Sequence, residues 1–424
     1  TSDNVAVTGG SGDDVIQMST GLNAYDTIDG GDGEDTVSIS LAAATGAEAA
    51  YSSQLATLSN VETLDVTSTN NAASVSMGSV SSDVSKIILG SNVRTVTVTG
   101  AIDTAGEDLA FTLNGVTTAI ATAAGTNSDA EIAAELATSI DALTGFSASV
   151  AGAAVTITAT SGNAVEFTSL VNTTDTTDPV EFTVGDYTNA GVTNLAADNS
   201  QVVEIHTGND VSIALADGSA ADDSVSLVLG TVTADKGVVQ TINQITVANT
   251  ETLNLEVTGR TDTVDTVVTT LTADATLTTL NITGESDIDL SGTVTASKLT
   301  TIDASSATGD VTADVSVVAT GGSTVKGGSG ADNFIFGAGL DNTDSVDGGD
   351  GTDVLSADIS GYAGAAASKG ALSVADVETL NLTATSTTGL DAAGITGATQ
   401  ISLSGAQTGT TTITNLAAGV AVGF

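Results

Sequence analysis

Four short segments of this 424-residue chain combine glycine and aspartate in one order, G-G-x-G-x-D-x-U-x, where U is a large apolar residue. Because glycine adopts positive φ readily, such a turn can direct several backbone carbonyls towards one point. The aspartate adds a carboxylate oxygen, and a hard cation such as Ca²⁺ prefers oxygen ligands. The segments therefore predict cation-binding turns, with Ca²⁺ as the expected ion.

The candidate ligand positions form two groups, one in each half of the chain. The first group is Gly10, Gly12, Asp14, Asp26, Asp29, Gly31, Asp32, Gly33 and Asp35. The second group is Gly328, Gly330, Asp332, Asp344, Asp347, Gly349, Asp350, Gly351 and Asp353. Asp26 and Asp344 belong to a degenerate turn that separates the two glycine motifs of each group.

The spacing of the motifs indicates how the turns are arranged. Residues 9–38 and 327–356 align without a gap at an offset of 318, and within each block the two motifs lie 21 residues apart. That distance is close to two nine-residue repeats, which predicts that both turns lie on the same side of a flattened coil and stack. Isolated Gly-Asp turns also occur in ordinary hairpins, but two pairs at identical spacing favour the stacked arrangement.

A second phrase recurs along the chain. It reads NVETLDVTST at 60–69 and DVETLNLTAT at 376–385, after the two glycine blocks, and NTETLNLEVT at 249–258 without such a block. Its glutamates, Glu62, Glu251 and Glu378, are interpreted as polar corners of coils. Their alternative role is that of additional cation ligands.

The rest of the chain predicts short strands. Alternating runs such as TLNLEVTG at 252–259 indicate half-buried strands. LTTLNITG at 277–284 recurs as LTTIDASS at 299–306, and a repeat of this length without helices predicts an all-β parallel β-solenoid. The alternative is a string of β-sandwich domains, which would usually contain more buried aromatic residues than this chain, with its four Tyr, seven Phe and no Trp, can supply.

Residues 101–187 depart from this pattern. Ser128 and Glu131 form a capping box, and Ile132, Leu136 and Ile140 lie on one helical stripe. With runs of alternating residues on both sides, this segment predicts a small inserted α+β domain. The expected organisation is a calcium block with solenoid coils at 1–100, the insertion at 101–187, and solenoid with the second block at 188–424.

The composition excludes several classes of function. With 52 acidic and seven basic residues the net charge is −45, so nucleic-acid binding is not expected. No apolar stretch is long enough to span a membrane. Without cysteine, and with His206 as the only histidine, zinc and haem sites are not expected either.

Catalysis is not predicted. A Ser–His–Asp triad around His206 is conceivable, but a solitary histidine in a strand is usually structural. Paired carboxylates could hydrolyse glycosides, yet the chain offers almost no aromatic rings on which a sugar would stack. The glycine segments lack the GK[ST] of a phosphate-binding loop. The chain is therefore expected not to be an enzyme.

The nonapeptides resemble the calcium-binding repeats of RTX proteins. Together with phrases such as VETLNLT at 377–383 and the acidic, cysteine-free composition, they make most of the chain outside 101–187 similar to the RTX-containing S-layer proteins of Gram-negative bacteria. The resemblance implies type I secretion, a bacterial cell-surface location and self-association into a calcium-dependent lattice or filament. An outer-surface polysaccharide is a further candidate partner.

The alternative function is that of a calcium-stabilised extracellular adhesin module. In that case residues 101–187 would bind a partner. Two features leave this alternative open: each block has only two nonapeptides, and the sequence has no identifiable cell-anchoring domain or secretion signal.

Overall fold

The computed structural model describes residues 5–18, 25–41, 57–68, 73–77, 83–90, 93–99, 108–113, 116–120, 128–159, 165, 167–173, 180, 182–184, 190–196, 198–206, 210–216, 218, 222–230, 240–258, 266–316, 322–360, 370–385, 388–405 and 409–424. The chain divides into two compact units. One unit comprises Thr1–Asn194, Val203–Ser212 and Val232–Val238, and the other comprises Leu195–Val202, Ile213–Thr231 and Val239–Phe424. Strands β17 (Asp198–His206) and β18 (Asp210–Leu215) are shared between them.

Parallel strands stack in the first unit. One ladder has the order β2-β4-β6-β8, formed by Val15–Gln17, Thr36–Leu41, Thr63–Ser68 and Lys86–Gly90. A second has the order β1-β3-β5, formed by Ala6–Thr8, Thr27–Asp29 and Leu58–Ser59. Strand β7 (Ala73–Ser76) pairs in parallel with β16 (Ala190–Leu195).

The first unit also contains antiparallel strands. One sheet has the order β11-β10-β14, formed by Val116–Ile120, Leu109–Leu113 and Phe167–Asn172. The other has the order β12-β13-β9-β15, formed by Phe146–Ala151, Ala154–Ala159, Val93–Val98 and Phe182–Val184. Helix α2 (Asp129–Asp141) begins at the predicted capping box, in which Ser128 and Glu131 exchange hydrogen bonds.

These antiparallel strands and α2 share one hydrophobic cluster. Ile132, Leu136 and Ile140 are buried in it, as the helical stripe predicted, and Phe111 stacks on Phe167 with ring centroids 6.0 Å apart. Strand β9 differs from the expectation. The RTVTVTG run at 94–100 was assigned to the solenoid, but β9 pairs antiparallel with β13 and β15. Its period-two alternation fits either kind of sheet, so the sequence pattern could not separate them.

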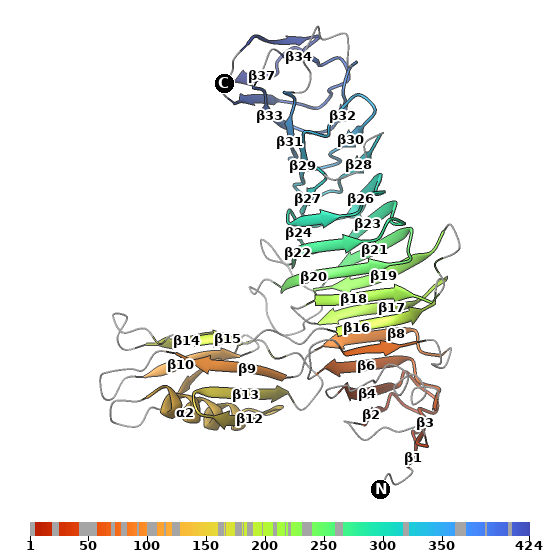
Figure 1. Cartoon of the computed structure of the whole chain (residues 1–424), viewed down its shortest axis with the longest axis vertical. Helices are drawn as coiled ribbons and strands as arrows, with labels where there is room; N and C mark the ends of the chain where they lie inside the picture. Colours follow the sequence, from red (N-terminus) through yellow and green to blue (C-terminus); the bar gives the residue numbers. More distant parts are fainter. Residues whose placement is uncertain are drawn as a thin grey trace. The chain divides into compact units, whose positions relative to one another are not determined.

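The second unit is a parallel β-solenoid with two long ladders (Figure 1). Its first ladder is β19-β21-β23-β26-β28-β30-β32, formed by Ser224–Leu229, Thr252–Val257, Thr279–Gly284, Thr301–Ala307, Thr324–Lys326, Ser345–Asp347 and Ser373–Ala375. Its second is β20-β22-β24-β27-β29-β31-β33-β35-β37, formed by Gln240–Ala248, Thr266–Ala273, Ile288–Leu290, Val311–Asp314, Asn333–Gly337, Val354–Asp358, Thr379–Thr383, Gln400–Ser404 and Ala421–Gly423. Strand β25 (Thr293–Thr295) pairs with β22, and β34 (Thr388–Asp391) pairs with β36 (Thr411–Thr414).

Alternation of side chains explains this architecture. In β19 every second residue is buried, and Val225, Leu227 and Leu229 face inward. The two LTT phrases occupy consecutive coils, with Leu280 opposite Ile302. Ladders of parallel strands confirm the predicted solenoid, because β-sandwiches are built from antiparallel sheets. Among the described residues, no helix has the length and apolarity that crossing a membrane requires.

The hydrophobic cluster predicts which deletion the solenoid tolerates. Replacing residues 93–187 by a short Gly-Ser link should leave the parallel β signal in circular dichroism and remove the helical signal. Replacing only 101–187, the boundary expected from the sequence, should give a less stable product that aggregates. It would strip the cover from Val96 and Val98, which are buried in the cluster, and burying one such side chain contributes about 1.5 kcal/mol or more. Loss of all β signal in the longer deletion would contradict an independent insertion.

Candidate cation-binding turns

The two glycine motifs of each block stack on consecutive coils, as their spacing predicted. In the first block Ile16 lies opposite Val37, and the Asp32 N–H donates to the Gly10 carbonyl at 3.0 Å. In the second block Phe334 lies opposite Leu355, and the Asp350 N–H donates to the Gly328 carbonyl at 2.9 Å. The apolar residue of each nonapeptide therefore starts a strand, and the turn before it lies directly over its copy.

Glycine is required for different reasons in the two turns of a block. The second turns use its backbone freedom, since φ is positive at Gly31, Gly33, Gly349 and Gly351. The first turns do not adopt positive φ. At Gly328 and Gly330 the requirement is space, because an added Cβ would overlap carbonyl oxygens of Ala307 and Gly309 on the preceding coil. Gly10 and Gly12 meet no such obstacle.

The motif aspartates form a column of backbone-to-carboxylate hydrogen bonds. In the first block the Asp14 N–H donates to Asp35 Oδ1 at 2.8 Å. In the second block the Asp332 N–H donates to Asp353 Oδ1 at 2.7 Å. Each carboxylate thus supports the backbone of the coil before it, which fixes the position of one of its two oxygens.

The glutamates of the recurring phrase end these columns. Glu62 Oε2 accepts the Asp35 N–H at 2.8 Å, and Glu378 Oε2 accepts the Asp353 N–H at 2.8 Å. Glu251 takes the same role towards Asp223, at 3.2 Å. The sequence indicated a polar corner here but not this bond. The repeated distance between aspartate and glutamate, 25 to 28 residues, was the available signal.

The second aspartate of each block has one oxygen without a hydrogen bond. Asp35 and Asp353 are both 0% exposed, and Oδ2 of each is buried with no partner. In the first turns the equivalent oxygens are satisfied, since the Gly10 N–H donates to Asp14 Oδ2 at 2.6 Å and the Gly328 N–H donates to Asp332 Oδ2 at 2.7 Å. A buried charged oxygen left unpaired is costly, by several kcal/mol on the order of the desolvation penalty, which makes these two atoms the strongest pointers to a ligand.

Backbone carbonyls lie close to these unpaired oxygens. A Cβ added to Gly30 would overlap both the Asn60 carbonyl oxygen and Asp35 Oδ2. A Cβ added to Gly348 would overlap both the Asp376 carbonyl oxygen and Asp353 Oδ2. Two Ca–O bonds span up to about 5 Å, so each pair of oxygens lies within reach of one ion. The donor set, carboxylate plus carbonyl, therefore fits a hard cation.

Electrostatics in the second block also favour a positive charge. Burial raises the pKa of Asp353 to about 7, despite the hydrogen bond from the Asp332 N–H, and the nearby carboxylates of Asp332, Glu378 and Asp310 raise it further. Burial likewise raises the pKa of Asp332, with Asp310 and Asp287 adding to the effect. A cation at this corner would favour the ionised carboxylates that their surroundings otherwise disfavour.

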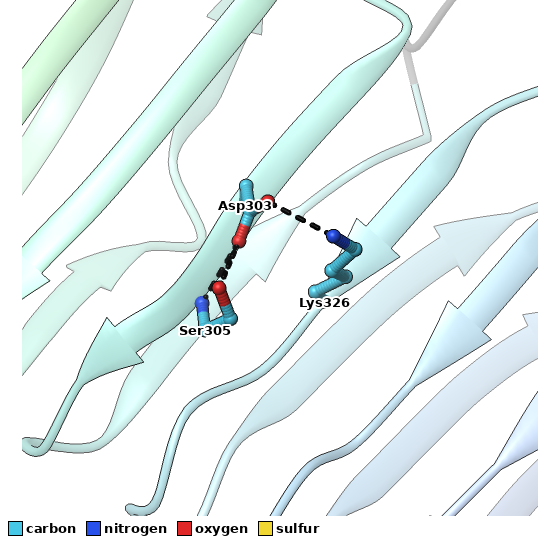
Figure 2. Close-up of polar contacts among 3 residues, drawn as sticks. All are labelled: Asp303, Ser305 and Lys326. Atoms are coloured by element: carbon cyan, nitrogen blue, oxygen red, sulfur yellow. Dashed lines mark hydrogen bonds and ion pairs between the residues drawn. The ribbon is translucent and has the colours of Figure 1, made fainter.

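Asp303, one coil away from the second block, is an instructive contrast (Figure 2). It accepts hydrogen bonds from the backbone N–H and hydroxyl of Ser305 at 3.0 and 2.5 Å, and Lys326 Nζ lies 3.1 Å from its Oδ2. Partial burial alone would raise its pKa, but the Ser305 hydrogen bonds and the Lys326 charge lower it. The fold thus pairs this carboxylate fully, unlike Asp353.

The remaining candidate ligands are distributed over several places. Asp26 Oδ1 accepts the Val5 N–H, and Asp344 Oδ1 accepts the Ser323 N–H, both at 2.8 Å. These two aspartates therefore support the preceding coil outside the glycine turns. Asp29 accepts a hydrogen bond from Asn60 Nδ2 at 2.7 Å, and Asp347 accepts one from the Gly349 N–H at 3.3 Å. Asp32 and Asp350 are exposed in the turns.

Side chains alone do not form a metal cage. Among the described residues, no three or more His, Cys, Asp or Glu side chains converge on a point suited to a metal ion. A cation at the glycine turns would therefore take much of its coordination from backbone carbonyls. His206 is the last residue of β17, and its side chain lies outside the described part of the structure.

The raised pKa of Asp353 predicts a pH dependence of stability in the presence of a chelator. The ordinary pKa is 3.8 and the folded value is about 7, so between these values the native state binds more protons than the unfolded chain. The free energy of unfolding should therefore fall as the pH rises from 5 to 7 and level off above 7. Chemical denaturation at a series of pH values measures this slope.

Two variants separate Asp353 from the other acidic residues. Asp353→Asn should flatten the slope, since asparagine does not ionise. Asp358→Asn should keep it, because hydrogen bonds from Ser360 lower the pKa of Asp358, which is ionised throughout this range. An unchanged slope in Asp353→Asn would contradict the assignment.

Comparison with known proteins adds no relative. No protein-family model, curated protein or solved structure matches this chain significantly. Functional reasoning about the chain therefore starts from its repeats and from the geometry of its turns.

Proposed function

We propose that the protein binds Ca²⁺ at its two glycine blocks and that the ions are part of its folded structure. The observation that carries this proposal is the pair of buried, unpaired oxygens, Asp35 Oδ2 and Asp353 Oδ2. Each lies beside a backbone carbonyl, at a turn whose glycines have positive φ. Hard oxygen donors in a flexible backbone cage suit Ca²⁺ better than Mg²⁺, which demands a smaller octahedral shell and retains its waters.

The residues divide the work of holding the ion. Asp35 and Asp353 would supply carboxylate oxygens, and Asn60 and Asp376 would supply carbonyls. The bound ion contributes positive charge that offsets repulsion among neighbouring carboxylates. Glu62 and Glu378 hold the aspartate backbones from the next coil, so they position the ligands.

Chelation is expected to unfold the glycine blocks. Circular dichroism in excess chelator should lose part of the β signal, and Ca²⁺ should restore it while Mg²⁺ restores it poorly, because binding and folding are coupled. The double variant Asp35→Asn, Asp353→Asn should require at least about tenfold more Ca²⁺ for half-recovery, equivalent to about 1.4 kcal/mol.

The matched control removes the same charge from exposed positions. Glu34→Gln, Glu285→Gln changes two exposed carboxylates and should recover at the same Ca²⁺ concentration as the parent protein. A parent spectrum that does not change in excess chelator would refute the calcium proposal.

We further propose that the calcium-loaded protein is a structural component of the bacterial cell surface that self-associates into a lattice or filament. The charge of −45 opposes contact between copies, and salt screens it only beyond about 10 Å. Bound Ca²⁺ would remove two charges per ion and order the repeated surface. Heterologous contacts between such surfaces extend into arrays unless they close into a ring. The resemblance to RTX S-layer proteins supports the same direction, and no catalytic role is assigned.

Assembly is therefore expected to depend on Ca²⁺. Light scattering and negative-stain imaging during a Ca²⁺ titration should reveal ordered arrays or fibres that disperse on chelation. Asp35→Asn, Asp353→Asn should not assemble at the Ca²⁺ concentration that assembles the parent, whereas Glu34→Gln, Glu285→Gln should. Calcium-loaded protein that stays monomeric at high concentration would refute the lattice.

One structural feature favours the adhesin alternative. The antiparallel region has its own core, and it exposes Val116, Val150 and Val171 by 59, 41 and 46%. Exposed apolar side chains of this kind are candidates for contact with a partner. A variant that lacks residues 93–187, still binds Ca²⁺ and still assembles, but no longer attaches to cells, would assign attachment to this region.

A further inference from the structure

A third aspartate shares the unusual environment of Asp35 and Asp353. Asp223 is 3% exposed, and its Oδ2 is buried with no hydrogen-bond partner. It lies immediately before β19, as Asp35 lies before β4 and Asp353 before β31. No complete glycine motif precedes it, so the sequence pattern did not select it.

Its contacts repeat those of the glycine blocks bond by bond. The Asp223 N–H donates to Glu251 Oε2 at 3.2 Å, as the N–H groups of Asp35 and Asp353 donate to Glu62 and Glu378. In return the Thr252 N–H donates to the Asp223 carbonyl at 3.0 Å, as Thr63 does to Asp35 and Thr379 to Asp353.

The strand register and backbone conformation agree as well. Ser224, the residue after Asp223, pairs with Thr252, just as Thr36 pairs with Thr63 and Val354 with Thr379. Asn249, two residues before the glutamate, has φ 59°, and Asn60 and Asp376 both have φ 49°. These are uncommon values for residues other than glycine, so their recurrence at one position marks a shared corner.

Gly218 completes the correspondence. It stands five residues before Asp223, as Gly30 stands before Asp35 and Gly348 before Asp353. A Cβ at Gly218 would overlap the Asn249 side chain and approach its carbonyl oxygen at 3.0 Å. The Asn249 carbonyl is therefore the counterpart of those of Asn60 and Asp376.

We propose that Asp223 binds a further divalent cation, Ca²⁺ in the first instance, with the Asn249 carbonyl as a neighbouring donor and Glu251 as the residue that positions Asp223. The inference rests on the proposed function, since it extends the same chemistry to a corner outside the glycine blocks. The site should be weaker than the other two. Ser219 and Ala221 occupy the sequence positions of Gly349 and Gly351, both of which need positive φ in the second block.

Binding stoichiometry tests the proposal on the full chain. Equilibrium dialysis against calcium chloride should find one ion fewer in Asp223→Asn than in the parent protein. Asp222→Asn removes the same charge from an exposed neighbour and should bind as many ions as the parent. Circular dichroism in Ca²⁺ establishes that each variant is folded. Equal stoichiometry in folded Asp223→Asn and parent would overturn the proposal.

Hydrogen exchange on the parent protein gives a second test that needs no variant. The amides of Glu251 and Thr252 donate to the Asp223 carbonyl, and the Thr379 amide donates to the Asp353 carbonyl. All three should exchange at least about tenfold more slowly in saturating Ca²⁺, because local opening must then release the ion. The Glu251 and Thr252 amides should respond at the higher Ca²⁺ concentration.

The two amide sets also separate the two proposals. A response at Thr379 without one at Glu251 and Thr252 would overturn the Asp223 site and leave the calcium blocks intact. No response at any of the three, together with no bound ion in dialysis, would refute the proposed function itself.

Discussion

Parallel stacking in register places every polar corner directly against the corresponding corner of the next coil. In the glycine blocks those corners are aspartates, so Asp14 meets Asp35 and Asp332 meets Asp353. Hydrogen bonds from backbone N–H groups satisfy one oxygen of each lower aspartate, but they do not neutralise its charge. Like charges at such short range repel strongly when solvent is excluded. The rest of the turn is arranged around this one electrostatic problem.

The chain answers it with two local devices. Glycines with positive φ, such as Gly349 and Gly351, shape the turn before the aspartate. The following coil then contributes a residue with positive φ and a glutamate, Asp376 and Glu378 in the second block. The glutamate accepts the N–H of the aspartate, which leaves the second carboxylate oxygen free for another ligand. The recurring phrase is thus the partner of the aspartate, and its sequence distance from the glycines reflects one coil of the solenoid.

Much of the fold follows from periodicity. Alternation of period two with repeats of 21 to 22 residues led to stacked parallel coils, and the capping box at Ser128 led to α2. Strand β9 was misplaced because an alternating run such as RTVTVTG can be buried equally well in a parallel or an antiparallel sheet. Its partners, β13 and β15, lie far along the chain, and local pattern carries no information about a pairing at that distance.

The sequence by itself determined the residue types and the spacing of the sites: aspartates 21 residues apart, glycines before them and a glutamate after them. It could not rank chemically identical aspartates. Asp26, Asp35 and Asp223 are all buried, yet Asp26 supports Val5 while Asp35 and Asp223 each keep an unpaired oxygen. Only the tertiary structure decides this, because the hydrogen-bond partner of each carboxylate comes from a neighbouring coil, and the stacking register determines which N–H group lies within reach.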